Sequence, residues 1–339
     1  MKRVSTSVGL VLAAALIAGC SATQAEAGDP APTDAPAIEK VRFTVFPGAL
    51  ASMGVYIADA MGFFEAEGLE IEYVNASTGT SSIQLLVGNQ TDFAITDVPA
   101  VANARASGAD VVLVAGQFTR FSGQLVCREG AISSDASYPE VMAALEGRKV
   151  GITGPGSSTD TYTRYSLIDA GVDPSEVEIL PIGGIPQLLA ALESEAIDCA
   201  TAYQPMQLQL TDDRVIVDWQ GGEGPAAFGD YLYNAIGASA SFAEENPEII
   251  ERLGRAMSAA ADFGNDPGNA EAIAAATIGF FEGLSEEDLA TTTKQIAGTY
   301  GAAITDTQID NCAKVYEAAY GKPLGVKRED IVAAAVSGS

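Results

Sequence analysis

The chain reads Val150-Gly-Ile-Thr-Gly-Pro-Gly-Ser-Ser-Thr159 near its middle and continues as Asp160-Thr-Tyr-Thr-Arg-Tyr-Ser-Leu-Ile-Asp-Ala170. This stretch decides the fold, because it predicts a strand, a glycine-rich turn and a helix in direct succession. Such a junction points free N–H groups and the positive end of a helix dipole at one spot. We expect a small, polar and partly negative ligand there, and an ordinary capped helix after a tight turn is the alternative.

This stretch does not match either of two nucleotide-binding motifs. A P-loop needs a Lys after its last glycine, and no Lys follows here. A dinucleotide fingerprint needs a third glycine near Thr159 and an acid at the far end of the next strand, whereas Glu176 and Glu178 stand at the start of that strand. A simpler cradle for an anion or a polar ligand remains.

The N-terminus has the features of a bacterial lipoprotein signal. Lys2 and Arg3 precede an apolar run over residues 8–18, and Leu16-Ile-Ala-Gly-Cys20 places small residues before a cysteine. The run is far short of the ~20 residues that span a bilayer. We expect a signal peptide over residues 1–19, lipidation of Cys20 and an anchor on the extracytoplasmic face of the cell membrane. A simple secretion signal is the alternative, and residues 20–39 predict a flexible tether.

Composition excludes several functions. The formal net charge is −27 and argues against nucleic acid as a partner. The sequence has no His, which excludes Ser-His-Asp and Cys-His nucleophile systems and His-containing metal sites. Cys127, Cys199 and Cys312 form no CxxC pair, and we expect three small buried side chains with at least one free thiol. No catalytic residue, cofactor or metal is predicted, and the protein is not expected to be an enzyme.

Two α/β lobes of the same plan are predicted for the rest of the chain. The first opens with a strand over 41–46, a helix over 52–67 and a strand over 71–74, a βαβ unit. A second glycine and hydroxyl turn at 77–82 precedes a helix over 83–88, and the apolar run 111–115 suits a parallel sheet. The chain crosses to the second lobe near 121–123 and returns over 235–241. Lobe I is therefore placed at 40–122 with 240–336, and lobe II at 123–239.

A weak internal sequence repeat supports the prediction of two similar lobes. Gln84-Leu-Leu with Asp92-Phe-Ala-Ile-Thr in one lobe matches Gln187-Leu-Leu with Asp198-Cys-Ala-Thr in the other. The C-terminal part predicts helices over 247–263, 270–281, 286–300 and 307–320. Asn246, Ser285 and Asp306 are their expected caps. This tail is expected to pack on the first lobe rather than to form a site.

Several stretches resemble the nitrate, sulfonate and taurine group of ABC-transporter substrate-binding proteins, the NMT1/THI5-like or SsuA/TauA-like family. They follow the family's order over roughly residues 40–260, and each alone is weak. The segments are Ile57-Ala-Asp-Ala-Met-Gly-Phe-Phe-Glu-Ala-Glu-Gly-Leu-Glu70, Leu86-Val-Gly-Asn-Gln-Thr-Asp-Phe-Ala-Ile95, Ala104-Arg-Ala-Ser-Gly-Ala-Asp110, Gly154-Pro-Gly-Ser-Ser158 and Ala190-Ala-Leu-Glu-Ser-Glu-Ala-Ile-Asp198 with Pro205.

The resemblance implies a type II periplasmic-binding-protein fold, two α/β lobes joined by a double hinge, with a C-terminal helical tail. It implies a monomer that closes on a small-molecule solute and delivers it to an ABC permease and its ATPase. A small organic anion such as a sulfonate, taurine or nitrate is the first expectation for the solute. A pyrimidine or an aromatic carboxylate is the alternative, as is service to a membrane sensor. The family's yeast pyrimidine-precursor synthase uses a His and a cysteine-rich iron motif that this chain lacks.

The predicted ligand-binding residues lie in both lobes and at the crossing. Arg120 pairs either with an anionic group of the ligand or with Asp97, and Asp97 either receives an amine or caps the helix at Pro99. Phe121, Trp219 and Tyr203 either stack on a flat ligand or pack in the core. Arg164 is left out, because it lies two turns into its helix. The full set is Gly79, Thr80, Ser81, Thr96, Asp97, Arg120, Gly156, Ser157, Ser158, Thr159 and Tyr203.

Overall fold

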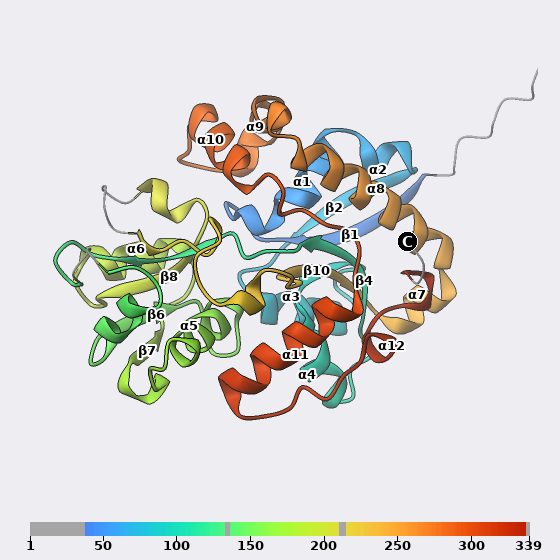
Figure 1. Ribbon diagram of the computed structural model, residues 1–339. Helices are drawn as coiled ribbons and strands as arrows, with labels where there is room; N and C mark the ends of the chain where they lie inside the picture. The colour runs from blue at the N-terminus through green and yellow to red at the C-terminus, as the bar shows by residue number, and fades with distance from the viewer. Residues whose placement is uncertain (1–37, 133–135, 210–214, 337–339) are drawn as a thin grey trace, which may run out of the picture. The chain divides into compact units, whose positions relative to one another are not determined.

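The computed structural model describes residues 38–132, 136–209 and 215–336 (Figure 1). The predicted signal peptide, Cys20 and most of the predicted tether lie outside the described residues. The first strand, β1 (Glu39–Val45), begins at the last residue of that tether. None of the helices in the described ranges combines the length and the apolar character that a membrane span requires.

The predicted βαβ unit is confirmed. β1 pairs in parallel with β2 (Leu69–Asn75), and α1 (Met53–Ala60) and α2 (Phe63–Ala66) connect the two strands. On its other side β1 meets β3 (Ala94–Thr96), where the Thr44 N–H donates to the Phe93 carbonyl at 2.9 Å. The side chains of Phe43, Phe64 and Phe93 are fully buried and pack against one another between these strands and their helices.

The apolar strand β4 (Val112–Phe118) has an antiparallel neighbour, contrary to the prediction of a parallel sheet. The returning strand β10 (Asn234–Ala238) lies between β3 and β4 and runs antiparallel to both. All seven residues of β4 are buried. The apolar run therefore indicates that both faces of the strand are buried, but it does not indicate whether the neighbouring strand is parallel or antiparallel. The strands follow one another as β2, β1, β3, β10 and β4, and the strand predicted to begin at residue 235 is present as β10.

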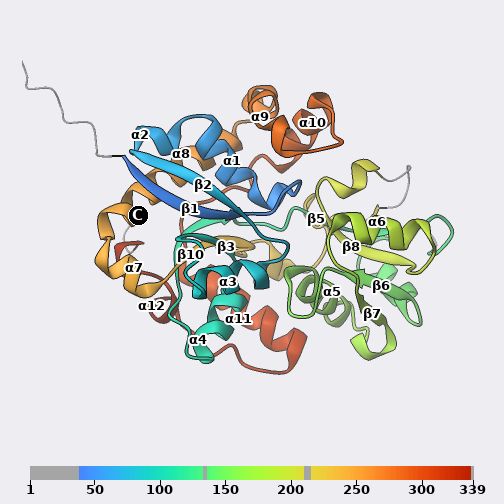
Figure 2. The same cartoon turned by 180° about the vertical axis from the view of Figure 1, so that it is seen from behind.

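A second sheet repeats this plan with other residues (Figure 2). The strand order is β7-β6-β8-β5-β9, in which β6 is parallel to β7 and β8, and β5 is antiparallel to β8 and β9. One antiparallel strand therefore stands next to the last strand in each sheet. The bounds are β5 (Gly123–Cys127), β6 (Lys149–Ile152), β7 (Glu178–Pro181), β8 (Cys199–Tyr203) and β9 (Val215–Val217).

The helices of the second sheet are α5 (Ser158–Asp169) and α6 (Ile185–Glu193). A 3-10 helix over Glu140–Leu145 precedes β6. Val126, Leu188 and Leu192 belong to a buried apolar cluster between α6 and the strands. On the α5 side the Thr163 hydroxyl hydrogen-bonds the Thr201 hydroxyl of β8.

A disulfide joins Cys127 to Cys199, a pairing that the sequence left open, and both residues are buried as predicted. The residues are opposite each other in the antiparallel register of β5 and β8. They are 72 positions apart in sequence, and only the pairing of the strands brings them together. Cys312 is buried and free, as predicted.

The C-terminal part is helical, as predicted, with two different caps. The Ser285 hydroxyl accepts a hydrogen bond from the Asp288 N–H, as expected, but Asn246 makes no side-chain cap bond. Thr305, and not Asp306, caps the last long helix. The helices are α7 (Ala240–Glu245), α8 (Pro247–Asn265), α9 (Ala270–Thr277), α10 (Glu286–Ile296), α11 (Asp306–Tyr320) and α12 (Arg328–Ile331).

The C-terminal helices were expected to pack on the first lobe, but α11 also contacts a helix of the second sheet. α11 packs against α4 (Val98–Ala106), which follows β3, and also against α5 of the second sheet (Figure 1). The chain after α11 returns to the first sheet, where Val332 bridges Leu113 of β4. α11 is therefore in contact with a helix that follows a strand of the first sheet and with a helix that follows a strand of the second.

Candidate functional site

One cleft brings the two glycine and hydroxyl turns together. It holds about 660 Å³ of space, part of it open to solvent, and nine of the eleven predicted ligand-binding residues line it. Ser81 and Arg120 are the two that do not. The lining consists of Phe46, Ala51, Ser77, Thr78, Gly79, Thr80, Ile95, Thr96, Asp97, Ala100, Thr153, Gly156, Ser157, Ser158, Thr159, Tyr203, Tyr233 and Asn234.

Three helices begin at this cleft. Thr78 caps α3 (Gly79–Val87) through its hydroxyl, which accepts from the Ser81 N–H at 3.1 Å, and the Ser81 hydroxyl accepts from the Thr78 N–H in return. Asp97 caps α4 and Ser157 caps α5. The helix predicted from residue 83 therefore starts four residues earlier, at Gly79, because Thr78 supplies the cap. The positive ends of three helix dipoles face one space.

Two N–H groups at each of two helix starts have no partner within the described residues. They belong to Gly79 and Thr80 in the first turn of α3, and to Ser158 and Thr159 in the first turn of α5. The first N–H groups of a helix have no acceptor inside the helix and readily bind anions. The cleft therefore offers backbone donors from two helices, one that follows a strand of the first sheet and one that follows a strand of the second.

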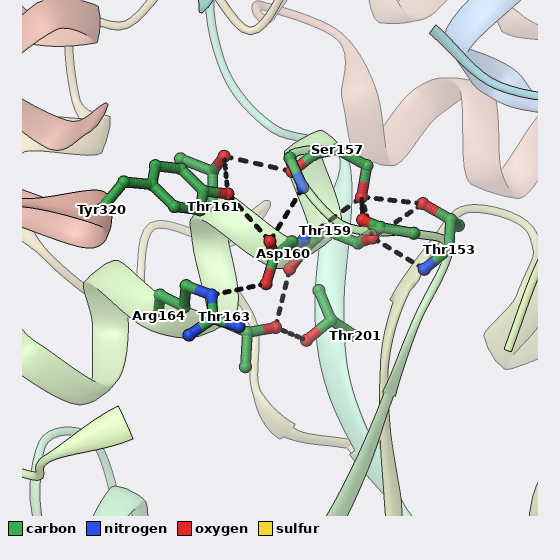
Figure 3. A network of polar contacts seen from close by, with 11 residues as sticks. Thr153, Ser157, Thr159, Asp160, Thr161, Thr163, Arg164, Thr201 and Tyr320 are labelled. Carbon is green, nitrogen blue, oxygen red and sulfur yellow. Dashed lines mark hydrogen bonds and ion pairs between the residues drawn. The ribbon is translucent and has the colours of Figure 1, made fainter. Parts of the chain in front are cut away.

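The turn before α5 uses some of its predicted donors internally (Figure 3). The Gly156 N–H donates to Asp160 Oδ2 at 2.9 Å, and the Ser157 hydroxyl donates to the Gly154 carbonyl at 2.7 Å. The Thr159 hydroxyl accepts from the Thr153 N–H at 2.9 Å. Gly156 and Ser157 thus shape the turn, while Ser158 and Thr159 keep free N–H groups.

Gly156 stands at φ +73°, in the left-handed region, and a Cβ there would meet no atom within 4 Å. We predict that Gly156→Ala lowers the free energy of unfolding by about 1 kcal/mol through backbone strain alone. Urea denaturation measures this change. Gly154→Ala is the matched control, since a Cβ also meets nothing there and the backbone is not left-handed. Equal stability of the two variants would contradict the prediction.

Asp97 is the charged side chain of the cleft among the described lining residues. Its Oδ1 accepts from the Ala100 N–H at 2.7 Å, and its Oδ2 accepts from the Ser158 hydroxyl at 3.3 Å. The carboxylate thus links the starts of α4 and α5. Burial raises the pKa of Asp97 to about 6, although these two hydrogen bonds act in the opposite direction.

Arg120 does not line the cleft, and no ion pair joins it to Asp97 among the described residues. The alternative of an ion pair between these two residues is therefore wrong for this structure. Arg120 lies between β4 and β5, at the predicted crossing between lobes. Phe121 and Trp219 are buried and pack with Tyr162, which favours core packing over ligand stacking, whereas Tyr203 does line the cleft.

The floor of the cleft contains residues that the sequence reading missed. Asn234 accepts a hydrogen bond from the Gln117 amide through Oδ1, and its Nδ2 has no acceptor among the described residues. The Thr96 hydroxyl, a predicted site atom, is buried without a partner. Tyr233 adds an aromatic wall. The position of Asn234 at the start of the predicted return strand was the available signal for it.

The described residues include no cluster of three His, Cys, Asp or Glu side chains with the geometry of a metal site. The polar groups of the cleft are backbone N–H groups, hydroxyls, one amide and one carboxylate. This arrangement can hydrogen-bond a small polar molecule, and the sequence has no His to form an activated nucleophile of the Ser-His or Cys-His kind.

Comparisons with known proteins agree on one architecture. The family model described as NMT1/THI5 like matches residues 50–270. No curated protein sequence matches the chain. A solved structure of a Bordetella bronchiseptica RB50 protein is 23% identical, with a TM-score of 0.67 over 82% of this chain and 89% of that one.

Two further similar structures are of solute-binding proteins whose ligands are named. The periplasmic aliphatic sulphonate binding protein SsuA from Escherichia coli is 16% identical, with a TM-score of 0.69 over 89% of this chain and 99% of that one. The periplasmic nitrate-binding protein NrtA from Synechocystis PCC 6803 is 18% identical, with a TM-score of 0.59 over 75% and 70%. At these identities the likeness shows the fold, which is the periplasmic-binding-protein fold.

Proposed function

The chain belongs to the NMT1/THI5-like family, and from this premise we propose that it is an extracytoplasmic solute-binding protein of an ABC importer. It captures a small organic anion in the cleft and delivers it to a permease and its ATPase. The observation that carries the proposal is the convergence of three helix starts, with unpaired N–H groups of α3 and α5, on one cleft. The sulphonate- and nitrate-binding neighbours support this choice of ligand class.

The charged group in the cleft narrows the range of candidate ligands. Asp97 is an acid beside the backbone donors, and no Lys or Arg side chain lines the described cleft. A simple anion gains from the helix dipoles but is repelled by an ionised Asp97. A zwitterion such as taurine places its sulfonate on the N–H groups and its ammonium on Asp97, so we favour it. A pyrimidine or an aromatic carboxylate, held against Tyr203 and Tyr233, is the second candidate.

The mechanism involves binding without bond making. We propose two lobes, residues 40–122 with 240–336 and residues 123–239, with one change: strand β10 (Asn234–Ala238) pairs with β3 and β4 and is assigned to the first lobe. The lobes close on the solute like a hinge, remove water from it, and the permease recognises the closed form. We further propose that the protein acts as a monomer, anchored through lipidated Cys20 on the outer face of the membrane. Service to a membrane sensor is the alternative.

A thermal-shift screen tests the ligand class. The panel contains taurine, ethanesulfonate, nitrate, a pyrimidine and an aromatic carboxylic acid. A ligand at 100 times its Kd is expected to stabilise the protein by about 2.7 kcal/mol. A shift with the pyrimidine and none with any anion would overturn the proposal. Titration calorimetry of the compounds that shift the midpoint then ranks their affinities.

The ionisation of Asp97 is expected to make taurine binding depend on pH. Because the ammonium needs the carboxylate form, taurine affinity should fall about tenfold per pH unit below pH 6. The folded pKa of about 6 exceeds the ordinary value of 3.8. In the free protein the contribution of this group to stability is therefore present below about pH 4 and is lost as the pH rises through 6.

Asp97→Asn is the control for this dependence. Asn caps a helix about as well as Asp, so α4 keeps its start. The variant should bind taurine weakly and independently of pH between 4 and 7, and it should bind ethanesulfonate, which lacks the amine, better than the wild type does. Calorimetric titrations at several pH values measure both effects. Equal loss of both ligands would show that Asp97 does not recognise the amine.

A further inference from the structure

The carboxylate of Asp160 is the centre of a buried network next to the cleft (Figure 3). Asp160 is 1% exposed. Its Oδ2 accepts the Gly156 N–H at 2.9 Å, and its Oδ1 accepts Arg164 Nε at 2.7 Å. The carboxylate therefore holds the left-handed glycine of the turn whose next residues, Ser158 and Thr159, present free N–H groups to the cleft.

The last residue of α11 completes this network. The Tyr320 hydroxyl donates to Asp160 Oδ2 at 3.0 Å and lies 3.0 Å from the Thr161 hydroxyl. The Arg164 guanidinium lies over the Tyr320 ring, with its central carbon 6.0 Å from the ring centre. A buried carboxylate is stable only when its oxygens are paired, and hydrogen bonds to a charge are stronger than neutral ones. Tyr320 therefore restrains the Asp160 oxygen that also holds Gly156.

α11 also contacts α4, the helix that follows β3 of the first sheet. On the same face of α11, one turn before Tyr320, the Tyr316 hydroxyl bonds the Asn103 side chain of α4 at 3.1 Å. The rings of Tyr316 and Tyr320 lie 4.7 Å apart. α11 thus holds the helix that Asp97 caps and the helix that Ser157 caps at the same time.

We propose that Tyr320 and Asp160 are positioning residues for the ligand-binding turn, and that the C-terminal helix α11 sets the geometry of this turn through them. Neither residue lines the cleft. The effect passes through the Gly156 N–H to the free N–H groups of Ser158 and Thr159. The role in ligand capture rests on the proposed function, whereas the control of the turn by α11 does not.

Amide hydrogen exchange of the full chain without ligand tests the control of the turn. Tyr320→Phe removes one oxygen and should speed exchange of the Gly156 amide about threefold. Asp160→Ala removes its acceptor and should speed it about tenfold or more. Tyr316→Phe is the matched control: it removes the same atom from the same helix but from a bond to Asn103, and it should leave the Gly156 amide unchanged.

A Gly156 amide that exchanges at the wild-type rate in Tyr320→Phe would overturn the proposal. So would faster exchange spread over the whole protein with a lower unfolding midpoint, since that pattern indicates general stability. In the binding arm, Tyr320→Phe should weaken taurine about threefold and Tyr316→Phe should not. A wild-type protein that binds neither taurine nor ethanesulfonate overturns the proposed function, and the exchange result still decides the role of α11.

Discussion

Replacing Ser158 by Phe is expected to weaken solute binding about 100-fold or more, which corresponds to about 2.7 kcal/mol of binding free energy. Ser158 lines the cleft and its hydroxyl faces Asp97, so a ring at this position occupies the space between the starts of α4 and α5. The α5 cap is Ser157, which stays in place, and Phe and Ser have similar helix propensities. The unfolding midpoint should therefore stay within about 2 °C of the wild type.

Calorimetric titration with taurine and ethanesulfonate measures the effect on binding. Ser241→Phe is the matched control, because Ser241 is exposed in the first turn of α7 and does not line the cleft. This variant should bind like the wild type. If Ser158→Phe binds with wild-type affinity, the turn before α5 only caps the helix and does not bind the solute, which is the alternative given by the sequence.

Loss of the Cys127–Cys199 disulfide is expected to have the largest effect on stability. The bond closes a sequence separation of 72 residues, and loops of this length predict about 4 kcal/mol of stabilisation. For a folded unit of about 300 residues this corresponds to a fall of about 6 °C in the unfolding midpoint. The double variant Cys127→Ala with Cys199→Ala, followed by calorimetry, measures it.

Chemical reduction of the wild type is the control, because the reductant breaks the S–S bond, each sulfur gains a hydrogen, and no side-chain atom is removed. Reduction should lower the midpoint of the wild type by a similar amount and leave the double variant unchanged. A non-reducing peptide map should show Cys127 and Cys199 linked and Cys312 free. A link that involves Cys312 would contradict the assignment.

Local sequence patterns predicted those strands and helices that are marked by apolar runs and by turn residues at their ends. The βαβ unit at the start of the chain and the return strand near 235 were predicted from apolar runs and turn residues, and both are present. The helix starts were less accurate. At α3 the cap Thr78 precedes a polar first turn, so apolar periodicity alone put the start four residues late.

The candidate site was predicted in part, and the misses have a common cause. Hydroxyl and glycine turns mark helix starts in the sequence, and those of α3 and α5 do meet at the cleft. Arg120 is one sequence step from the crossing but does not line the cleft, and Asn234, which does, carries no motif. Which side chain at a crossing faces the cleft depends on strand register and twist, which residue types do not encode locally.

The sequence by itself determined the class of fold, the two glycine and hydroxyl turns that precede helices, and the absence of imidazole chemistry, because these follow from residue type and short-range spacing. Only the tertiary structure decided which groups meet over long separations. It paired Cys127 with Cys199, placed Ser158 against Asp97, and brought Tyr320 to Asp160. Such contacts arise when sheets and helices pack, since strand order and helix packing join positions that no local pattern relates.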